Sequence, residues 1–333
     1  MRKYLIWCLI VLQIFSYMSC NKKLLSEKEI TLVMAEVNPA ESIAGQMDQA
    51  FKQKVEELSG GKIKIDLQCS GILGDIETLM SMATSGGSSV QILRLSPPSF
   101  APYDCPKTLM LSTPFTFSSK EHFWKFANSQ TAQALWEEPL QNGAGLRCLF
   151  VGEEGFRHFF STKEIKTVED FNGLKVRGTN DKAMQGILKG LKADSISVNY
   201  VDLYGALQTG VIEAAEQPIA NYLTNHFNKV APHMILDGHT LGIMIAAITE
   251  ECWQELTPGQ RDILIEAGKY ASEFCKKLSQ TEEDTVKAQL VDEGASLVEV
   301  NDIKVWQDSC KEIIEDCAKA DPALYQEILS YAN

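Results

Sequence analysis

The alternation of apolar and polar positions predicts an α/β fold in the first part of the chain. Apolar residues recur at helical spacing over residues 44–58, and a second helical pattern runs from Asp75 to the glycines at 86–87. Residues 62–68 alternate as a strand does, and mostly apolar segments at 27–37 and 90–95 flank these elements. The order β-α-β-α-β indicates a sheet with parallel strands.

A second α/β unit is predicted to start near Gly155. Thr167 and Asp170 have the spacing of a capping box, with Asp in place of Glu. A long helical pattern begins at Pro258 and ends at Gly294, far beyond the usual length of about 11–12 residues, so this helix can brace two domains. The remaining predicted elements are helices at 119–136, 181–190 and 202–209, strands at 146–151, 174–177, 195–200, 241–248 and 296–300, and two terminal helices.

Length and charge narrow the class of protein. The 333 residues suffice for two domains with proper cores. The 44 acidic and 31 basic residues give a net charge of -13, and no run of Lys or Arg breaks the excess of acid. Nucleic-acid binding is therefore not expected, because phosphate recognition needs a basic face.

The N-terminus reads as a targeting segment. Arg2 and Lys3 precede an apolar run at 4–15 that is too short to span a bilayer, and Ser19-Cys20 follows. A small residue before a cysteine resembles the cleavage box of bacterial lipoproteins. We therefore expect a lipoprotein signal peptide at 1–19, lipidation of Cys20 and a tether at 20–29. The alternative is an ordinary signal peptide with an incidental cysteine.

Seven cysteines remain after Cys20, and an odd number cannot all pair within one chain. Most are expected to be buried thiols. They are Cys69, Cys105, Cys148, Cys252, Cys275, Cys310 and Cys317.

Arginines at strand positions are the candidates for ligand chemistry. Arg177 ends the apolar strand at 174–177, and ligands of open α/β sheets gather at the carboxyl ends of strands. A guanidinium recognises a carboxylate through two parallel hydrogen bonds. Arg94 lies within an apolar strand, where a charge must find a partner or a wet cavity. Each could instead form an ion pair or reach the surface.

Several motifs in a fixed order resemble the substrate-binding proteins of TRAP transporters, the DctP family. One stretch holds most of them, although the family's Asn is replaced here by Gln217. The motifs are Gly155-Phe-Arg157, Gly173-Leu-Lys-Val-Arg177, Tyr204-Gly-Ala-Leu-Gln208-Thr-Gly210 and Glu216-Gln217-Pro218.

The resemblance implies a two-lobed periplasmic-binding-protein-like fold of the type II kind, with the ligand cleft between the lobes. We expect lobe I to comprise residues 30–154 and 240–282, and lobe II residues 155–239 and 283–333. Arg177 matches the arginine that clamps the substrate carboxylate in such proteins. Arg157, Gln217 and the aromatic Tyr200 are further expected contacts, and a third cation at Arg94 would favour a dicarboxylate.

The resemblance also implies the partners. A lipid-anchored monomer on the periplasmic side would deliver a small carboxylate to DctQ/DctM-like membrane subunits, without a metal or organic cofactor. A binding lipoprotein of an ABC transporter or a sensor is the alternative, possibly with an apolar ligand. An enzyme is less expected, because catalytic motifs are lacking and acidic pairs such as Glu153-Glu154 look solvated.

Overall fold

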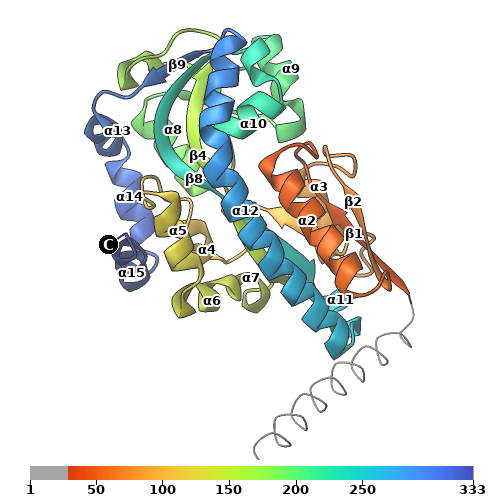
Figure 1. The fold of residues 1–333 in the computed structure, drawn as a ribbon. Coiled ribbons are helices and arrows are strands. Elements are labelled where there is room, and N and C mark those ends of the chain that lie inside the picture. The colour runs from red at the N-terminus through yellow and green to blue at the C-terminus, as the bar shows by residue number, and fades with distance from the viewer. Residues whose placement is uncertain (1–28, 333) are drawn as a thin grey trace, which may run out of the picture.

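Two long antiparallel strands form the centre of the protein, whose computed structural model describes residues 29–332. They are β4 (Leu146–Ser161) and β8 (His233–Thr249), paired from Leu146 with Thr249 to Ser161 with His233. Both strands belong to a nine-stranded sheet with the order β2-β1-β3-β8-β4-β7-β5-β6, and β9 pairs with β8. The two long strands β4 and β8 therefore each contribute to both lobes (Figure 1).

The first lobe has the predicted β-α-β-α-β order. Its strands are β1 (Ile30–Ala35), β2 (Ile63–Gln68) and β3 (Ile92–Leu95), with α2 (Ile43–Leu58) and α3 (Ile76–Thr84) between them. The strand β1 is parallel to both β2 and β3, which confirms the predicted parallel sheet, and β3 joins the C-terminal part of β8. The side chains of Ser42 and Asp75 cap the two helices.

The second lobe repeats the α/β plan on the other ends of the long strands. β7 (Ala214–Pro218) pairs with β4, β5 (Lys175–Gly178) is parallel to β6 (Asp194–Ser197), and β9 (Ser296–Glu299) lies along β8. The predicted capping box at Thr167 and Asp170 is present and opens η2 (Val168–Phe171). The helices of this part are α8 (Lys182–Gly190), η3 (Tyr200–Asp202), α9 (Leu203–Gln208), α10 (Ile219–Thr224) and η4 (Phe227–Lys229).

The predicted long helix is α12 (Pro258–Asp292), which contains 35 residues. It begins with a capping box formed by Thr257 and Gln260, and Pro258 occupies its first turn. The helix packs against α2 in one lobe and against α10 and β9 in the other. It therefore braces both lobes, as its diagonal course in Figure 1 shows.

Two helical predictions are wrong in detail. The single helix expected at 119–136 is divided into α5 (Lys120–Ala127) and α6 (Gln130–Trp136), because the Ser129 side chain caps a new helix. Three terminal helices replace the expected two: α13 (Ile303–Ser309), α14 (Lys311–Ala318) and α15 (Pro322–Ser330). The other helices are η1 (Pro97–Phe100), α4 (Pro106–Met110), α7 (Glu138–Gln141) and α11 (Glu250–Glu255).

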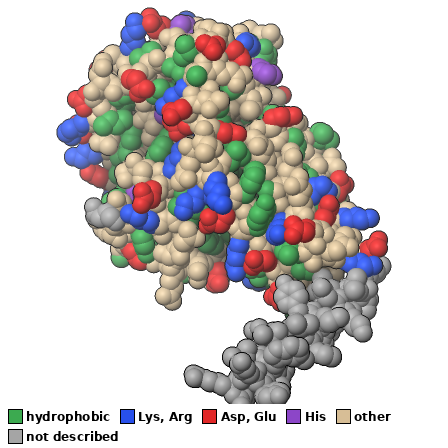
Figure 2. Space-filling model, in the orientation of Figure 1, with side chains coloured by type: hydrophobic (Ala, Val, Ile, Leu, Met, Phe, Trp, Pro, Cys, Tyr) green, Lys and Arg blue, Asp and Glu red, His purple; other side chains and the backbone are tan. Residues whose placement is uncertain are grey.

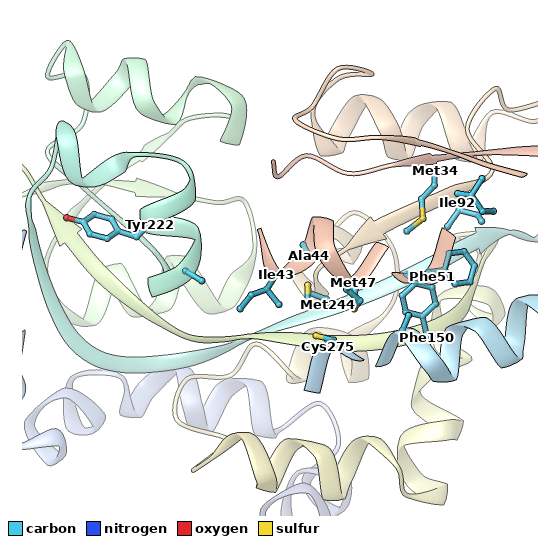
Figure 3. Packing of buried hydrophobic residues seen from close by; sticks show 14 of the residues in the cluster. Met34, Ile43, Ala44, Met47, Phe51, Ile92, Phe150, Tyr222, Met244 and Cys275 are labelled. Carbon is cyan, nitrogen blue, oxygen red and sulfur yellow. The ribbon is translucent and has the colours of Figure 1, made fainter. Parts of the chain in front are cut away.

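One apolar cluster joins α2 and α12 to the long strands. Met47 and Phe51 of α2 face Phe150 of β4, and the Phe51 and Phe150 ring centroids are 4.7 Å apart (Figure 3). Cys275 of α12 is fully buried in the same cluster. The seven cysteines from Cys69 onward are free thiols and five of them are buried, which confirms the prediction for most of them.

The surface carries charges of both signs. On the face shown in Figure 2, basic and acidic side chains are interspersed. No helix within residues 29–332 combines the length and apolar character needed to cross a membrane. Cys20 and the predicted signal peptide lie outside the described residues.

Candidate functional site

Arg177 lies on β5 and is partly buried. Its Nε atom donates a hydrogen bond to the carbonyl oxygen of Val198 at 2.9 Å. Within residues 29–332 the structure records no ion pair for this guanidinium. Burial lowers the pKa of Arg177 below its usual value, and the positive charge of Arg157 acts in the same direction, while Glu216 opposes them. The side chain is thus a desolvated cation without a paired acid.

Arg157, on β4, has a different environment. Its Nε and Nη2 atoms both bind the carboxylate of Glu216 on the neighbouring strand β7, with a distance of 2.9 Å from Nη2 to Oε1, and Nη1 lies 3.4 Å from Glu154. Burial raises the pKa of Glu216, but Arg157 and His239 outweigh it and lower the pKa to about 2. Arg157 is therefore held in a bidentate ion pair within the protein.

Arg94 lies in β3, and its guanidinium forms an ion pair with a buried glutamate. Its Nε and Nη2 atoms bind the two carboxylate oxygens of Glu36, which follows β1 directly. Both side chains are buried, at 5% and 0% exposure. Burial raises the pKa of nearby Asp48 well above its usual value, and the Glu36 carboxylate raises it further.

Tyr200 connects the two lobes. Its hydroxyl donates a hydrogen bond of 2.6 Å to Oδ1 of Asn38, a residue that follows β1. The ring centroid lies 5.9 Å from the Arg177 guanidinium carbon, within cation–π range. Tyr200 thus places Arg177 beside the first lobe.

Gln217 lies in β7 and is 2% exposed, opposite His158 of β4 in the strand register. Among the described residues, its side-chain amide has no recorded hydrogen-bond partner. Its neighbour Glu216 directs its carboxylate to Arg157 instead. Adjacent strand residues point to opposite faces of the sheet, so the two side chains serve different environments.

The structure adds site residues that the sequence does not reveal. Asn221 of α10 donates a hydrogen bond of 2.9 Å to Glu154 and lies 3.5 Å from Asn38. Its Oδ1 atom is buried and has no hydrogen-bond partner in the part of the chain that the structure describes. Glu153 and Glu154 are buried rather than solvated, at 0% and 5% exposure, because Gly155, Ser279 and Asn221 donate hydrogen bonds to them. No local sequence signal marks these tertiary partners.

Arg177, Arg157, Tyr200 and Arg94 consequently belong to one polar cluster. Arg157 joins it through Glu154, which also accepts a hydrogen bond from Asn221 beside Asn38. A chain of contacts leads from Arg177 to the Tyr200 ring, and from the Tyr200 hydroxyl to Asn38. Asn38 in turn donates to Glu36, the partner of Arg94, at 2.9 Å. The cluster therefore spans both lobes.

A separate cavity of about 360 Å³ lies beside the same long strands. Phe115, Phe156 and His158 line it, together with Asp237 and Glu283. None of the five predicted site residues lines this cavity. Within the part of the chain that the structure describes, no group of three potential ligands is arranged to hold a metal ion.

Comparison with known proteins identifies the family. The profile of the family described as "Bacterial extracellular solute-binding protein, family 7", DctP, matches residues 34–321. The sialic acid-binding periplasmic protein SiaP of Vibrio cholerae is 26% identical over 235 residues, which cover 71% of this chain and 70% of that protein.

Solved structures share the fold. A TRAP periplasmic solute-binding protein from Pseudomonas putida F1 with bound D-glucuronate has a TM-score of 0.85 at 23% identity, covering 90% of this chain and 96% of that one. The sugar acid binding protein DctPAm from Advenella mimigardefordensis in complex with galactonate has a TM-score of 0.86 at 22% identity, covering 92% and 98%.

These relatives are substrate-binding proteins, so the prediction that the chain is not an enzyme is confirmed. The two-lobed α/β fold is confirmed as well. The chain belongs to the DctP family, the substrate-binding proteins of TRAP transporters.

Proposed function

We propose that this protein captures a small organic acid through an arginine clamp at Arg177 and delivers it to TRAP membrane subunits. One observation carries the proposal. Of the three arginines in the polar cluster, Arg94 and Arg157 bind glutamates in bidentate pairs, whereas Arg177 has no ion pair within the described residues.

The energetics of burial favour an anionic ligand at this position. An uncompensated buried charge costs several kcal/mol. A carboxylate that accepts two parallel hydrogen bonds from the Arg177 fork would recover this cost, and the Val198 carbonyl already fixes one edge of the guanidinium. The ligand would thus complete the electrostatics of the site.

Ligands named for the relatives agree with this chemistry. The relatives described above were solved with D-glucuronate and galactonate, and another neighbour of the same fold was solved with succinate. Each of these molecules carries a carboxylate. We propose the same functional group for the ligand of this chain, with Gln217 in the place of the family's Asn as a candidate contact.

Closure of the lobes would enclose the acid. The lobes meet where Tyr200 binds Asn38, and Val201 lies so close to Gly71 that a Cβ atom there would be 2.9 Å from the Val201 side chain. Contacts that exist only in the closed state drive such hinge closure. The closed form would then dock on DctQ/DctM-like subunits. We place the protein, as a monomer, on the periplasmic side of the envelope.

We also propose that Cys20 carries a lipid that anchors the protein after cleavage of residues 1–19. The motif Ser19-Cys20 and the short apolar run before it support this proposal. Mass spectrometry of the protein purified from membranes should show an acylated cysteine at the new N-terminus. An unmodified N-terminus at another residue would contradict the anchor.

Thermal shift against mono-, di- and keto-carboxylates tests the binding function. We expect a saturable rise in melting temperature with at least one acid, and its loss in Arg177→Ala. Arg147→Ala is the matched control, because Arg147 also lies partly buried in the sheet but pairs with Glu250. A well-folded protein that responds to no acid would refute the carboxylate clamp.

A further inference from the structure

We infer that the ligand is a singly charged acid whose other polar groups are neutral hydrogen-bond donors, as in a hydroxy-monocarboxylate, and that dicarboxylates are rejected. The inference rests on the proposed clamp at Arg177. It concerns the rest of the ligand, which the remaining residues of the polar cluster would contact. The charges and hydrogen bonds of those residues carry it.

The first step is that Arg157 cannot recruit a second carboxylate without breaking an ion pair. Both oxygens of Glu216 are bound to its guanidinium, and Glu154 lies 3.4 Å from Nη1. Two acids thus surround one cation. A second ligand carboxylate would have to displace a buried glutamate, which would then lose its own partner.

Arg94 is neutralised in the same manner. Both oxygens of Glu36 bind it, and Glu36 also accepts hydrogen bonds from the Asn38 backbone and side chain. The third arginine therefore offers no free positive charge.

Beyond Arg177, both other arginines of the cluster already hold an acid partner. Glu36 binds Arg94 and Glu216 binds Arg157, and both glutamates are buried. A second ligand carboxylate would therefore find no free cation and would lie beside these glutamates, and like charges held together at a desolvated contact are strongly disfavoured.

One buried acceptor of the cluster still requires a donor. Asn221 is 1% exposed, and its Oδ1 atom has no hydrogen-bond partner in the described chain. Its Nδ2 atom donates to Glu154, so its carbonyl oxygen is free to accept. A buried acceptor without a partner is costly, and a ligand hydroxyl would satisfy it. Asn221 also neighbours Asn38, which Tyr200 links to Arg177.

Matched pairs of acids test the inference by isothermal titration calorimetry on the purified protein. Each pair differs only in a terminal CH₂OH or COOH: 4-hydroxybutanoate against succinate, and galactonate against galactarate. We expect the monocarboxylate to bind at least about tenfold more tightly in any pair that binds, which corresponds to ~1.4 kcal/mol. Equal or tighter binding of the diacid would overturn the inference.

Two variants assign the selectivity to the internal pairs. Glu36→Gln and Glu216→Gln each release one arginine from its ion pair. Either variant should therefore shift the ratio of monocarboxylate affinity to dicarboxylate affinity about tenfold toward the dicarboxylate. Glu216→Gln provides the test if Glu36→Gln does not fold. An unchanged ratio in folded variants would contradict the stated cause. Binding of both acids with equal, Arg177-dependent affinity would sink this inference and leave the clamp intact. Failure of every acid would refute the clamp itself.

Discussion

Arg157 and Arg177 lie in the same lobe, yet their surroundings give them opposite states. The Glu216 side chain satisfies Arg157, while the two terminal nitrogens of Arg177 have no recorded partner among residues 29–332. The sequence presents both as strand arginines in a motif. Strand position alone could not reveal their different partners, because Glu216 lies 59 residues from Arg157 and becomes its neighbour only through the pairing of β4 with β7.

Arg94 should matter for stability. Arg94→Ala would leave Glu36 as a buried acid without its cation, so we expect a loss of ~3–5 kcal/mol in unfolding free energy. The control is Lys304→Ala, because the Lys304–Asp308 pair is largely exposed and should contribute no more than ~1 kcal/mol. Urea unfolding measures both. Similar losses in the two variants would refute the importance of the buried pair.

His239 predicts a dependence of stability on pH. Burial lowers its pKa, but Asp237 and Glu216 outweigh it and raise the pKa to about 9. The folded pKa exceeds the unfolded value of about 6.5, so the stabilisation is complete below pH ~6.5 and disappears as the pH rises through 9. We expect the stability difference between the wild type and His239→Asn to shrink over this interval.

Urea unfolding at pH 6, 7.5 and 9 provides the test. The wild type and the variant share all cysteines and carboxylates, so their difference isolates His239. The expected change in that difference is on the order of 3 kcal/mol. A difference that stays constant from pH 6 to 9 would show that His239 is not held as a cation.

At the scale of elements, a small residue permits the close approach of α8 to the terminal helices. A Cβ atom on Gly190 would lie 2.0 Å from the backbone oxygen of Ser309. Gly190→Ala should therefore destabilise the fold by ~1–3 kcal/mol. Gly205→Ala is the matched control, since that helical glycine has open space around it and should gain up to ~1 kcal/mol. Denaturation midpoints that shift in the same direction would contradict this packing.

The sequence predicts elements well where their apolar period is regular. The helices at 44–58 and 258–292 and the parallel strands of the first lobe fall in this class. It predicts only parts of β4 and β8. In β4 the reason is that Gly152, Glu153 and Glu154 interrupt the apolar pattern. The two glutamates are accommodated in this buried strand because Ser279 and Asn221 donate hydrogen bonds to them, and the local sequence cannot show these tertiary partners.

At the scale of the whole molecule, Tyr200 provides a direct link between the lobes. Tyr200→Phe removes the hydroxyl that donates to Asn38, so we expect ligand affinity to fall about three- to tenfold. Tyr204→Phe is the control, because Tyr204 is 36% exposed and no hydrogen bond of its hydroxyl is recorded in the described chain. Calorimetry with the same acid compares the two. Equal affinities in both variants would exclude a role for this link in closure.

The sequence suggests the cations of the candidate site but not its acids. Motif order and strand position make Arg157 and Arg177 candidates, and the apolar surroundings of Arg94 require a partner. Glu36, Glu154 and Asn221 come from three distant segments, and only the pairing of strands and the packing of α10 bring them together. The pairing of Glu36 with Arg94 removes the reason for which a third cation would favour a dicarboxylate.

The most direct test of the account is the affinity of Arg177→Ala and Arg177→Lys for the tightest-binding acid, measured by calorimetry. Loss of one partner of a buried charge pair costs ~2–5 kcal/mol, so the alanine variant should bind about thirty- to several-thousand-fold more weakly. Lysine keeps the charge without the fork and should recover only part of the affinity. Unchanged affinity in a folded Arg177→Ala would contradict the clamp.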